Sequence, residues 1–326
     1  MAQLQRLQPS AKTRAQDFEA DLAEARAELW LGLSQNNARL SPKYFYDALG
    51  SKLFEAICAL DEYYLTRAET SIFMDYAEDI AAATGQGATL IDLGAGNCAK
   101  AASLFDVLKP QQYVPVDISV SFVQAAALKL AAEHPQIAIL PVGLDFTDNL
   151  HLPSAVNRQN RLFFYPGSSI GNYTPLQAMQ FLKRIHAVCE TDGGLLIGID
   201  LVKDHAVLQA AYDDALGVTA AFNLNALRHV NQLLESDFDV RAWQHRALFN
   251  AEQSRIEMHL EARQALNVAW PGGSRAFAAG ERIHTENSYK YTERSFLELL
   301  SSAGFGETLC WTDPARHFLV CYARAI

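Results

Sequence analysis

The stretch Leu-Ile-Asp-Leu-Gly-Ala-Gly at residues 90–96 decides the fold. An apolar run that ends in glycines predicts a buried strand followed by a tight loop. Because glycine has no side chain, the backbone of this loop can approach a ligand closely. Similar apolar runs at residues 113–117, 137–141, 161–165 and 194–200 are separated by helix-length segments. This alternation is typical of βαβ units and of a parallel sheet buried on both faces.

The chain on either side of this pattern has a different periodicity. Helical spacing of apolar residues predicts helices over about 13–33 and 51–60. Residues 204–237 also have helical spacing, and 255–263 alternate with period two, as expected for a half-exposed antiparallel strand. We therefore expect a second unit, built from the N-terminal helices and from an insertion into the first.

The C-terminal residues return to the α/β pattern. A helix is predicted at about 293–303, closed by Gly304, and two strands at 308–311 and 317–322 flank a short turn. Strands joined by so short a turn form an antiparallel hairpin, here at the edge of the sheet. The predicted domain boundaries group residues 1–67 with 203–290 in one domain, and residues 68–202 with 291–326 in the other.

Composition narrows the classes of partner. Half of the 326 residues are hydrophobic, which is enough for one elaborated domain or two. The net charge of −10, without a basic run, argues against binding to nucleic acid or to an anionic membrane surface. No apolar stretch is long enough for a membrane span and the first residues lack a signal-peptide pattern, so a cytoplasmic protein is expected. The five scattered cysteines form no Cys-x-x-Cys pair and predict no metal site.

Acidic residues stand where strands of the sheet end. Asp117 ends the second strand, where a carboxylate accepts hydrogen bonds from both ribose hydroxyls. Asp145 ends the third, where it can accept from an adenine amino group while Phe146 packs on the base. With a Gly-x-Gly turn and no phosphate-loop lysine, these acids predict an adenosine ligand without a pyrophosphate, S-adenosylmethionine (SAM). Lys100, in the first turn of the following helix, is placed to reach its methionyl carboxylate.

Two other interpretations of the glycine turn stay open at this point. Ala99 stands where the dinucleotide fingerprint has its third glycine, and alanine is sometimes accepted there, so nicotinamide binding is weakened without being excluded. A tight strand-to-helix turn without any ligand is the other interpretation. Each acid taken singly suits a solvated strand end, and the joint placement along one sheet edge favours a ligand.

Seven further segments carry a more specific pattern of aromatic, glycine, asparagine and charged residues. They are residues 43–47 (KYFYD), 50–54 (GSKLF), 62–69 (EYYLTRAE), 167–172 (GSSIGN), 200–204 (DLVKD), 211–214 (AYDD) and 285–290 (TENSYK). In these segments the chain closely resembles the histidine Nα-methyltransferases of ergothioneine biosynthesis, the EgtD family, from about residue 42 onward.

The resemblance implies a fold and a reaction. The fold is α/β: a class I SAM-dependent methyltransferase with a Rossmann-like, doubly wound sheet and an antiparallel C-terminal hairpin, joined to a separate substrate-binding domain. The reaction is the Nα-methylation of free L-histidine in three successive transfers, which gives hercynine and S-adenosyl-L-homocysteine (SAH). The resemblance further implies a monomer, and the chemistry calls for no metal.

The resemblance also implies a role for each matched residue. The cofactor-binding residues are Tyr63, Gly94, Lys100, Asp117, Asp145 and Phe146. For the substrate, Tyr46 and Tyr212 bind the carboxylate, Asn172 and the backbone at Gly167 hold the α-amine, Glu286 and Ser288 bind the imidazole, and Phe54 and Met258 wall the pocket. The catalytic residues are Asn172, which orients the amine, and Tyr63, which with water is the hypothetical route for the departing proton.

Alternatives to this assignment remain. The tyrosines and Met258 also suit core packing, and Asn172 suits a turn or a helix N-cap ahead of Pro175. Related enzymes methylate tryptophan derivatives, although Glu286, Ser288 and Met258 suit an imidazole better than an indole. A non-catalytic SAM-binding protein is a third hypothesis. Leu65 and Pro166 depart from the family pattern, and Pro166 leaves the number of added methyl groups open.

Overall fold

The computed structural model describes residues 11–147, 149–190 and 192–326, and the chain divides into two compact units. Unit 1 comprises Met1–Glu55, Ala215–Ala247 and Met258–Glu286, and unit 2 comprises Ala56–Asp214, Leu248–Glu257 and Asn287–Ile326. This division differs from the predicted domains at residues 56–67, 203–214, 248–257 and 287–290, which belong to unit 2.

The helices agree with the predicted ones in the regions where helical spacing is clear. They are α1 (Ala11–Leu33), α2 (Ala48–Cys58), α3 (Tyr64–Asp75), α4 (Ala77–Thr84), α5 (Ala99–Ala102), α6 (Phe105–Leu108), α7 (Val120–Glu133), α8 (Pro175–Cys189), α9 (His205–Tyr212), α10 (Val218–Leu234) and α11 (Glu293–Ser302). Short 3-10 helices are η2 (Pro42–Phe45), η3 (Ser169–Asn172) and η4 (Val240–Ala242). None of the helices within the described ranges is long and apolar enough to span a membrane.

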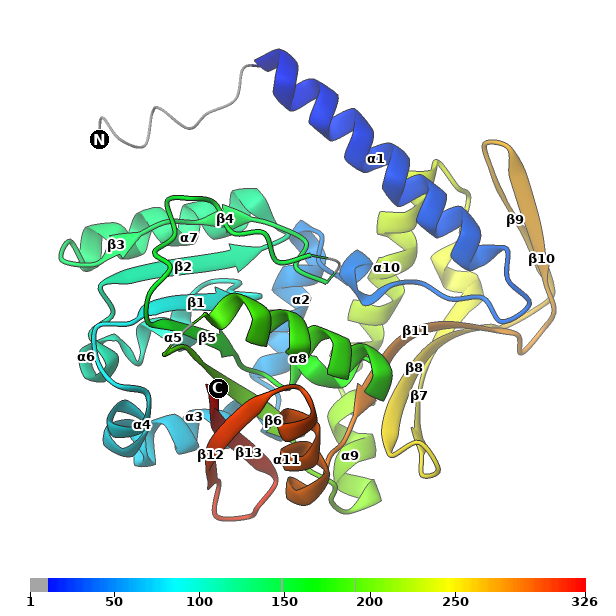
Figure 1. Cartoon of the computed structure of the whole chain (residues 1–326). Coiled ribbons are helices and arrows are strands. Elements are labelled where there is room, and N and C mark those ends of the chain that lie inside the picture. The colour runs from blue at the N-terminus through cyan, green and yellow to red at the C-terminus, as the bar shows by residue number, and fades with distance from the viewer. Residues whose placement is uncertain (1–10, 148, 191) are drawn as a thin grey trace. The chain divides into compact units, whose positions relative to one another are not determined.

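The strands form three sheets. They are β1 (Thr89–Leu93), β2 (Gln112–Asp117), β3 (Ala138–Ile139), β4 (Val142–Gly143), β5 (Arg161–Tyr165), β6 (Gly194–Asp200), β7 (Trp243–Asn250), β8 (Arg255–Ala262), β9 (Leu266–Trp270), β10 (Gly273–Phe277), β11 (Arg282–Tyr289), β12 (Phe305–Thr312) and β13 (Phe318–Ala325). The large sheet has the order β12-β13-β6-β5-β1-β2-β3, with β4 also paired to β2 (Figure 1).

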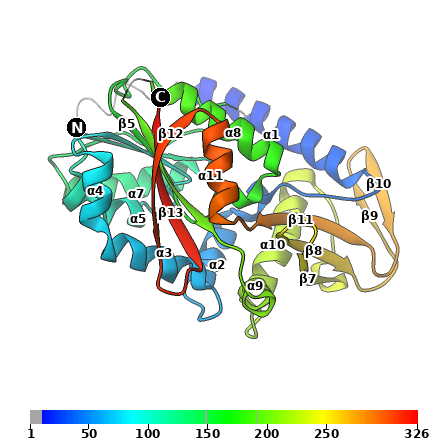
Figure 2. The ribbon, with the colours of Figure 1, turned by 60° about the horizontal axis from the view of Figure 1, so that its bottom comes forward.

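Unit 2 contains this large, mostly parallel sheet. Strands β6, β5, β1 and β2 run parallel, whereas β13 pairs antiparallel with β6 and β12 with β13. Figure 2 shows β12 and β13 side by side. The predicted doubly wound sheet with an antiparallel C-terminal hairpin at its edge is therefore confirmed. The predicted strand over 137–141 is instead two short strands, because Pro141 has no N–H to donate to a ladder.

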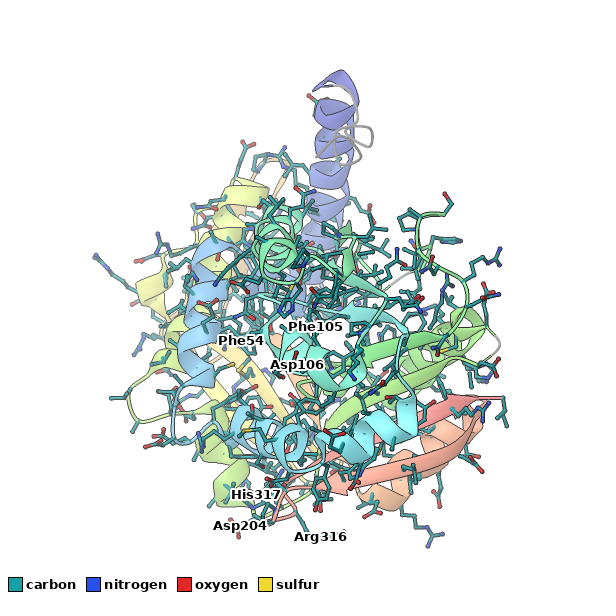
Figure 3. All side chains as sticks on the ribbon, turned by 90° about the vertical axis from the view of Figure 1, so that its left-hand side faces the viewer. Phe54, Phe105, Asp106, Asp204, Arg316 and His317 are labelled. Carbon is teal, nitrogen blue, oxygen red and sulfur yellow. The ribbon has the colours of Figure 1, made fainter. Side chains whose placement is uncertain are left out.

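Helices cover both faces of the large sheet. On one face, Phe181 of α8 and Phe296 of α11 are fully buried in a core with strand residues such as Phe163. On the other face, Phe73 of α3 contacts Phe164, and the ring of Phe105 in α6, which is labelled in Figure 3, lies 5.0 Å from that of Tyr113. Burial on both faces explains why the strands are continuous apolar runs in the sequence.

Unit 1 contains α1, η2, α10 and the β9–β10 hairpin. Helix α10 packs against α1 and η2, and the rings of Phe45 and Phe222 lie 4.6 Å apart in its core. Each strand of the three-stranded sheet β11-β8-β7 has residues in both units, because the division between the units falls within all three strands. The alternating burial of β8 confirms the predicted half-exposed strand over 255–263.

Candidate active site

Backbone hydrogen bonds to the neighbouring strand fix the conformation of the glycine turn after β1. The N–H groups of Gly94 and Ala95 both donate to the carbonyl of Val116 in β2, at 2.8 and 3.1 Å. Gly94 and Gly96 have φ angles of +73° and +53°, a left-handed conformation that favours glycine. A Cβ on Gly96 would meet no atom within 4 Å, so the turn borders open space. Its backbone can therefore approach a ligand.

Two of the predicted cofactor residues lie against this turn. Asp117 accepts hydrogen bonds from the N–H groups of Gly96 at 2.9 Å and Ser119 at 2.8 Å, which fixes its carboxylate at the carboxyl end of β2. The ring of Phe146 lies 3.8 Å from the position of a Cβ on Gly94. The structure thus brings Gly94, Asp117 and Phe146 together, as the sequence predicted.

Asp145 follows β4 and its carboxylate accepts from the backbone N–H of Thr147 at 3.0 Å. It is half-buried, and the adjacent Phe146 ring packs 6.0 Å from the rings of Tyr165 and Phe181. The rings of Tyr165 and Phe181 pack against Phe146, and another side of the Phe146 ring faces the glycine turn. A carboxylate beside an aromatic ring offers an acceptor and a stacking surface for a base.

Lys100 lies beside the turn and is anchored by an acid that the sequence did not single out. Its ammonium nitrogen is 2.5 Å from Oε2 of Glu69 in α3, and Oε1 of Glu69 accepts from the N–H of Gly167 at 2.7 Å. Glu69 is completely buried. Gly198 of β6 makes room for it, because a Cβ there would lie 2.2 Å from Oε1. One carboxylate therefore ties the predicted cofactor lysine to the predicted amine-binding loop.

Gly167 begins the loop that carries Asn172. Gly167 has a φ of +76°, and η3 ends at Asn172. This 3-10 turn packs closely against the end of β11, since a Cβ on Gly171 would lie 2.9 Å from the carbonyl oxygen of Tyr289. The N-cap of α8 is Thr174, which forms a capping box with Gln177. Asn172 is therefore not the N-cap of this helix, and its half-buried side chain is available for another role.

Tyr212 and Ser288 converge on a buried lysine. The Tyr212 and Ser288 hydroxyl oxygens are 2.7 Å apart, and the ammonium of Lys290 donates to them at 3.0 and 2.7 Å. Lys290 also pairs with Oδ2 of Asp200 at 2.7 Å, and both charged side chains are fully buried. Burial lowers the pKa of Lys290, but Asp200 and Tyr212 outweigh this effect and hold the pKa above its usual value.

Asp200, at the end of β6, serves a second lysine as well. Lys203 bonds its Oδ1, and the hydroxyl of Tyr64 donates to both carboxylate oxygens at 2.7 and 2.8 Å. Burial raises the pKa of Asp200, but Lys290 and Lys203 together hold the pKa below its usual value. Burial also lowers the pKa of Lys203 to about 8, against the attraction of Asp200. We call Asp200, Lys203, Lys290 and Tyr64 the Asp200 cluster.

Tyr63 contacts the proposed substrate residue Tyr212. It precedes α3, is 9% exposed, and its ring lies 6.2 Å from that of Tyr212 in an edge-to-face arrangement. Its neighbour Tyr64 belongs to the Asp200 cluster, and Glu69 lies further along the same helix. The predicted dual role of Tyr63, toward cofactor and substrate, stays a prediction.

Three further predicted substrate residues lie in unit 1, at two separate places: Tyr46 with Phe54, and Met258. The rings of Tyr46 and Phe54 lie 5.7 Å apart, and both contact Phe222 of α10, at 5.8 and 5.9 Å. Met258 of β8 is buried, and its carbonyl accepts from the hydroxyl of Thr285 at 3.0 Å. Phe222 was missed in the sequence, where it is one apolar residue of an apolar helix.

Glu286 and Ser288 occupy alternate positions of β11, so they project to the same side of the strand. Glu286 is half-buried and Ser288 is buried. This alternation is as predicted, while the binding of an imidazole by the two residues stays a prediction.

Comparison with known proteins identifies the family. Residues 25–325 match the model of the SAM-dependent, histidine-specific methyltransferases. The chain is 41% identical to the histidine N-alpha-methyltransferase of Mycolicibacterium smegmatis, over 91% of this chain and 94% of that protein. It is 40% identical to the enzyme of the same name from Mycobacterium tuberculosis, over 90% and 92%. It is also 30% identical to ergothioneine biosynthesis protein 1 of Neurospora crassa, over 86% of this chain and 32% of that protein.

The chain belongs to the histidine-specific, SAM-dependent methyltransferase family. For a member of this family, the open glycine turn with Asp117 and Phe146 suits the adenosine part of SAM, because a backbone cradle, a carboxylate and a ring lie together. Within the described ranges, no group of three or more histidine, cysteine or acidic side chains is arranged to hold a metal ion.

Sequence reasoning for this histidine-specific methyltransferase missed Glu69 and the Asp200 cluster. Glu69 had a detectable signal, since it shares the buried face of α3 with Leu65, Ile72 and Phe73. An acid on an otherwise apolar helix face indicates a buried partner. Lys290 gave no such signal, because its burial depends on contacts with distant parts of the chain.

Proposed function

We propose that this protein transfers methyl groups from SAM to the α-nitrogen of free L-histidine, in three successive steps that give hercynine, within ergothioneine biosynthesis. The observation that carries the proposal is the link through Glu69. Its carboxylate holds both Lys100, beside the glycine turn, and Gly167, in the loop of Asn172. The names of the two mycobacterial relatives and of the fungal one support the substrate and the pathway.

The cofactor end uses the residues around the glycine turn. Asp117 accepts from the ribose hydroxyls, Asp145 and Phe146 hold the adenine, and Lys100 faces the methionyl carboxylate, with Gly94 and Tyr63 completing the site. When bound, SAM supplies a methyl group that its sulfonium has already activated. The protein therefore needs no nucleophile of its own, and its task is to place and deprotonate the amine.

The amine is oriented by Asn172 and by the backbone at Gly167. An amide oxygen accepts from the amine N–H and aims the nitrogen lone pair at the methyl carbon, at a separation of roughly 3–3.5 Å in a reactive geometry. Each of the first two products must lose a proton before it can react again, and Tyr63 or a water takes it. After the third transfer the nitrogen has no lone pair, so the product loses these hydrogen bonds and leaves.

The rest of the substrate is held by hydrogen bonds. The hydroxyls of Tyr46 and Tyr212 donate to the carboxylate, Glu286 and Ser288 pair with the imidazole nitrogens, and Phe54 and Met258 line the pocket. A buried polar pair rejects ligands that cannot satisfy it, which favours histidine over tryptophan. Histidine and SAM are the only partners of this proposal, which describes a cytoplasmic monomer without nucleic acid, membrane or metal.

The test is a mass-resolved time course of the purified protein with SAM and each of the twenty free amino acids. We expect gains of one, two and three methyl groups on histidine alone. A gain on tryptophan would show that Glu286 and Ser288 do not select an imidazole. Binding of SAH without a gain on any amino acid would support a non-catalytic SAM-binding protein instead.

A further inference from the structure

The Asp200 cluster places an unusual group beneath two proposed substrate residues. The ammonium of Lys290 has three N–H donors, and the structure gives each a partner: Asp200 at 2.7 Å, Ser288 at 2.7 Å and Tyr212 at 3.0 Å. An ammonium cannot accept a hydrogen bond, so both hydroxyl oxygens must accept from it. The two hydroxyl oxygens are also 2.7 Å apart, so one hydroxyl donates to the other. With Ser288 as the donor, the proton of Tyr212 points away from both Lys290 and Ser288.

The charge of Lys290 is only partly cancelled. Its carboxylate partner Asp200 is shared with Lys203, and the hydroxyl of Tyr64 also donates to it. Lys203 in addition faces Asp313, in the turn between β12 and β13. The ammonium of Lys290 thus has one shared carboxylate, and its other hydrogen-bond partners among the described residues are the hydroxyls of Tyr212 and Ser288. A hydroxyl that accepts from an ammonium is a stronger donor on its other side.

We propose that Lys290, fixed by Asp200, is a positioning residue that acts through Tyr212 to make the site select a substrate with a free carboxylate. This inference rests on the proposed function, because it uses Tyr212 as the carboxylate ligand. Lys290 itself is completely buried and reaches the substrate only through the two hydroxyls. The substrate class is therefore a free α-amino acid, and amines that lack the carboxylate are disfavoured by the loss of this charge-assisted contact.

A purely structural role for the lysine is the competing explanation. Buried ion pairs contribute little net stability on average, because desolvation offsets the attraction. The chain nevertheless buries two ammonium groups on one carboxylate. Only one of them contacts proposed substrate residues, and this difference makes the two lysines a matched pair for experiment.

The experiment compares Lys290→Met with Lys203→Met. Each variant removes one buried ammonium, and in each the other lysine still neutralises Asp200, so neither leaves a lone buried charge. Lys203 bonds Tyr64 and the carbonyl of Leu201, and no contact with Tyr212 or Ser288 is seen among the described residues. The substrates are histidine and histamine, which keeps the amine and the imidazole but lacks the carboxylate.

We expect Lys290→Met to raise the KM for histidine by about 10- to 100-fold, the range for losing a charge-assisted hydrogen bond. The kcat/KM for histamine should fall much less, because histamine lacks the carboxylate and keeps only the contact through Ser288, so the preference for histidine over histamine collapses. Lys203→Met should keep most of that preference. Parallel losses on both substrates in the two variants, or an unchanged preference in Lys290→Met, would overturn the proposal.

Folding is checked by thermal unfolding and by SAH binding, which a positioning role at the carboxylate leaves intact. If Lys290→Met does not fold, Tyr212→Phe removes the hydroxyl that stands between Lys290 and the carboxylate. It should lower the same preference, and an unchanged preference there would also overturn the proposal. Wild-type protein that methylates no amino acid would instead refute the proposed function, which keeps the two failures apart.

Discussion

Asp92 and Asp200 are both buried carboxyls on strands of one sheet, yet their surroundings shift their pKa values in opposite directions. Asp92, two residues before the glycine turn, has the Tyr113 hydroxyl as a donor at 2.7 Å, and burial raises its pKa to about 7. Asp200 faces two ammonium groups, which hold its pKa below the usual value despite burial. The region of the glycine turn is thus poor in buried positive charge, and the Asp200 cluster is rich in it.

The difference shows two ways in which one fold can place charged side chains relative to a ligand site. Around the glycine turn, the side chains proposed to contact the ligand directly, such as Asp117 and Lys100, are half-buried. At the Asp200 cluster, the charge stays buried behind the hydroxyls of Tyr212 and Ser288, through which we propose that it acts on the ligand. Direct contact favours affinity for a ligand that brings its own charges, whereas a buried charge behind hydroxyls favours selectivity.

The largest expected effect is at the cofactor end. Asp117→Ala removes the proposed ribose acceptor and also the carboxylate that holds Gly96 and Ser119, so we expect SAH to bind about 100-fold more weakly or worse. Titration calorimetry measures this directly. Asp106→Ala, at an exposed acid of α6 in the same unit, is the control (Figure 3). Equal SAH affinity in the two variants would remove Asp117 from the site.

A smaller effect is expected at Asn172, in the loop that begins at Gly167. Asn172→Ala should slow the first methyl transfer about 10- to 100-fold, because the amine loses the acceptor that orients it, while SAH affinity stays within about twofold. Single-turnover kinetics with mass detection separates the first transfer from the later ones. Unchanged kinetics with histidine would refute the assignment.

Glu69→Gln tests whether the two regions are connected. The amide oxygen can still accept from Gly167, but the negative charge beside Lys100 is lost. We expect the KM for SAM and the KM for histidine to rise together, each by roughly tenfold. Glu78→Gln makes the same chemical change at an exposed position of α4 and should leave both values unaltered. A rise in only one of the two constants in Glu69→Gln would show that this carboxylate does not couple the regions.

The smallest effect on activity is expected at Asp92. Between pH 4 and pH 7 the folded protein keeps the proton on Asp92, whereas the unfolded chain, with an ordinary pKa of 3.8, does not. The native state therefore binds more protons, and this carboxyl makes the free energy of unfolding fall as the pH rises through that range.

Asp92→Asn should remove this pH dependence and make the protein more stable than the wild type by about 1–3 kcal/mol at pH 8, with SAH affinity within about threefold. Denaturant unfolding at pH 5 and pH 8 provides the comparison. The same slope of stability against pH in both proteins would show that Asp92 is not the group responsible.

The sheet was largely predictable because its strands are apolar runs that end in recognisable residues. Glycine after β1 and Asp117 at the end of β2 mark the loops that the structure brings together. The break between β3 and β4 at Pro141 was missed, because an apolar run hides a missing ladder donor. The boundaries of the units were also placed differently, since they depend on contacts between distant segments.

For the site, the sequence predicts where a residue's motif lies in the fold, as for Asn172 at the end of η3 and Ser288 on β11, while the roles of both residues stay predictions. Burial of charge was not predictable in the same way. Lys290 and Lys203 both resemble ordinary solvated lysines in the sequence. Lys203 is only three residues from Asp200, whereas Lys290 reaches the same carboxylate because the chain after β11 lies beside the end of β6. A neighbour from elsewhere in the chain decides whether such a lysine is exposed or buried.

The central claim, that the α-nitrogen of histidine is the methyl acceptor, is tested most directly by locating the methyl groups on the product. We would incubate the purified protein with histidine and SAM carrying a carbon-13 methyl group, and record the NMR spectrum of the product. The account predicts that every labelled methyl is bonded to the α-nitrogen. A labelled methyl on a ring nitrogen would contradict it, because Glu286 and Ser288 would then present the imidazole, and not the amine, to the cofactor.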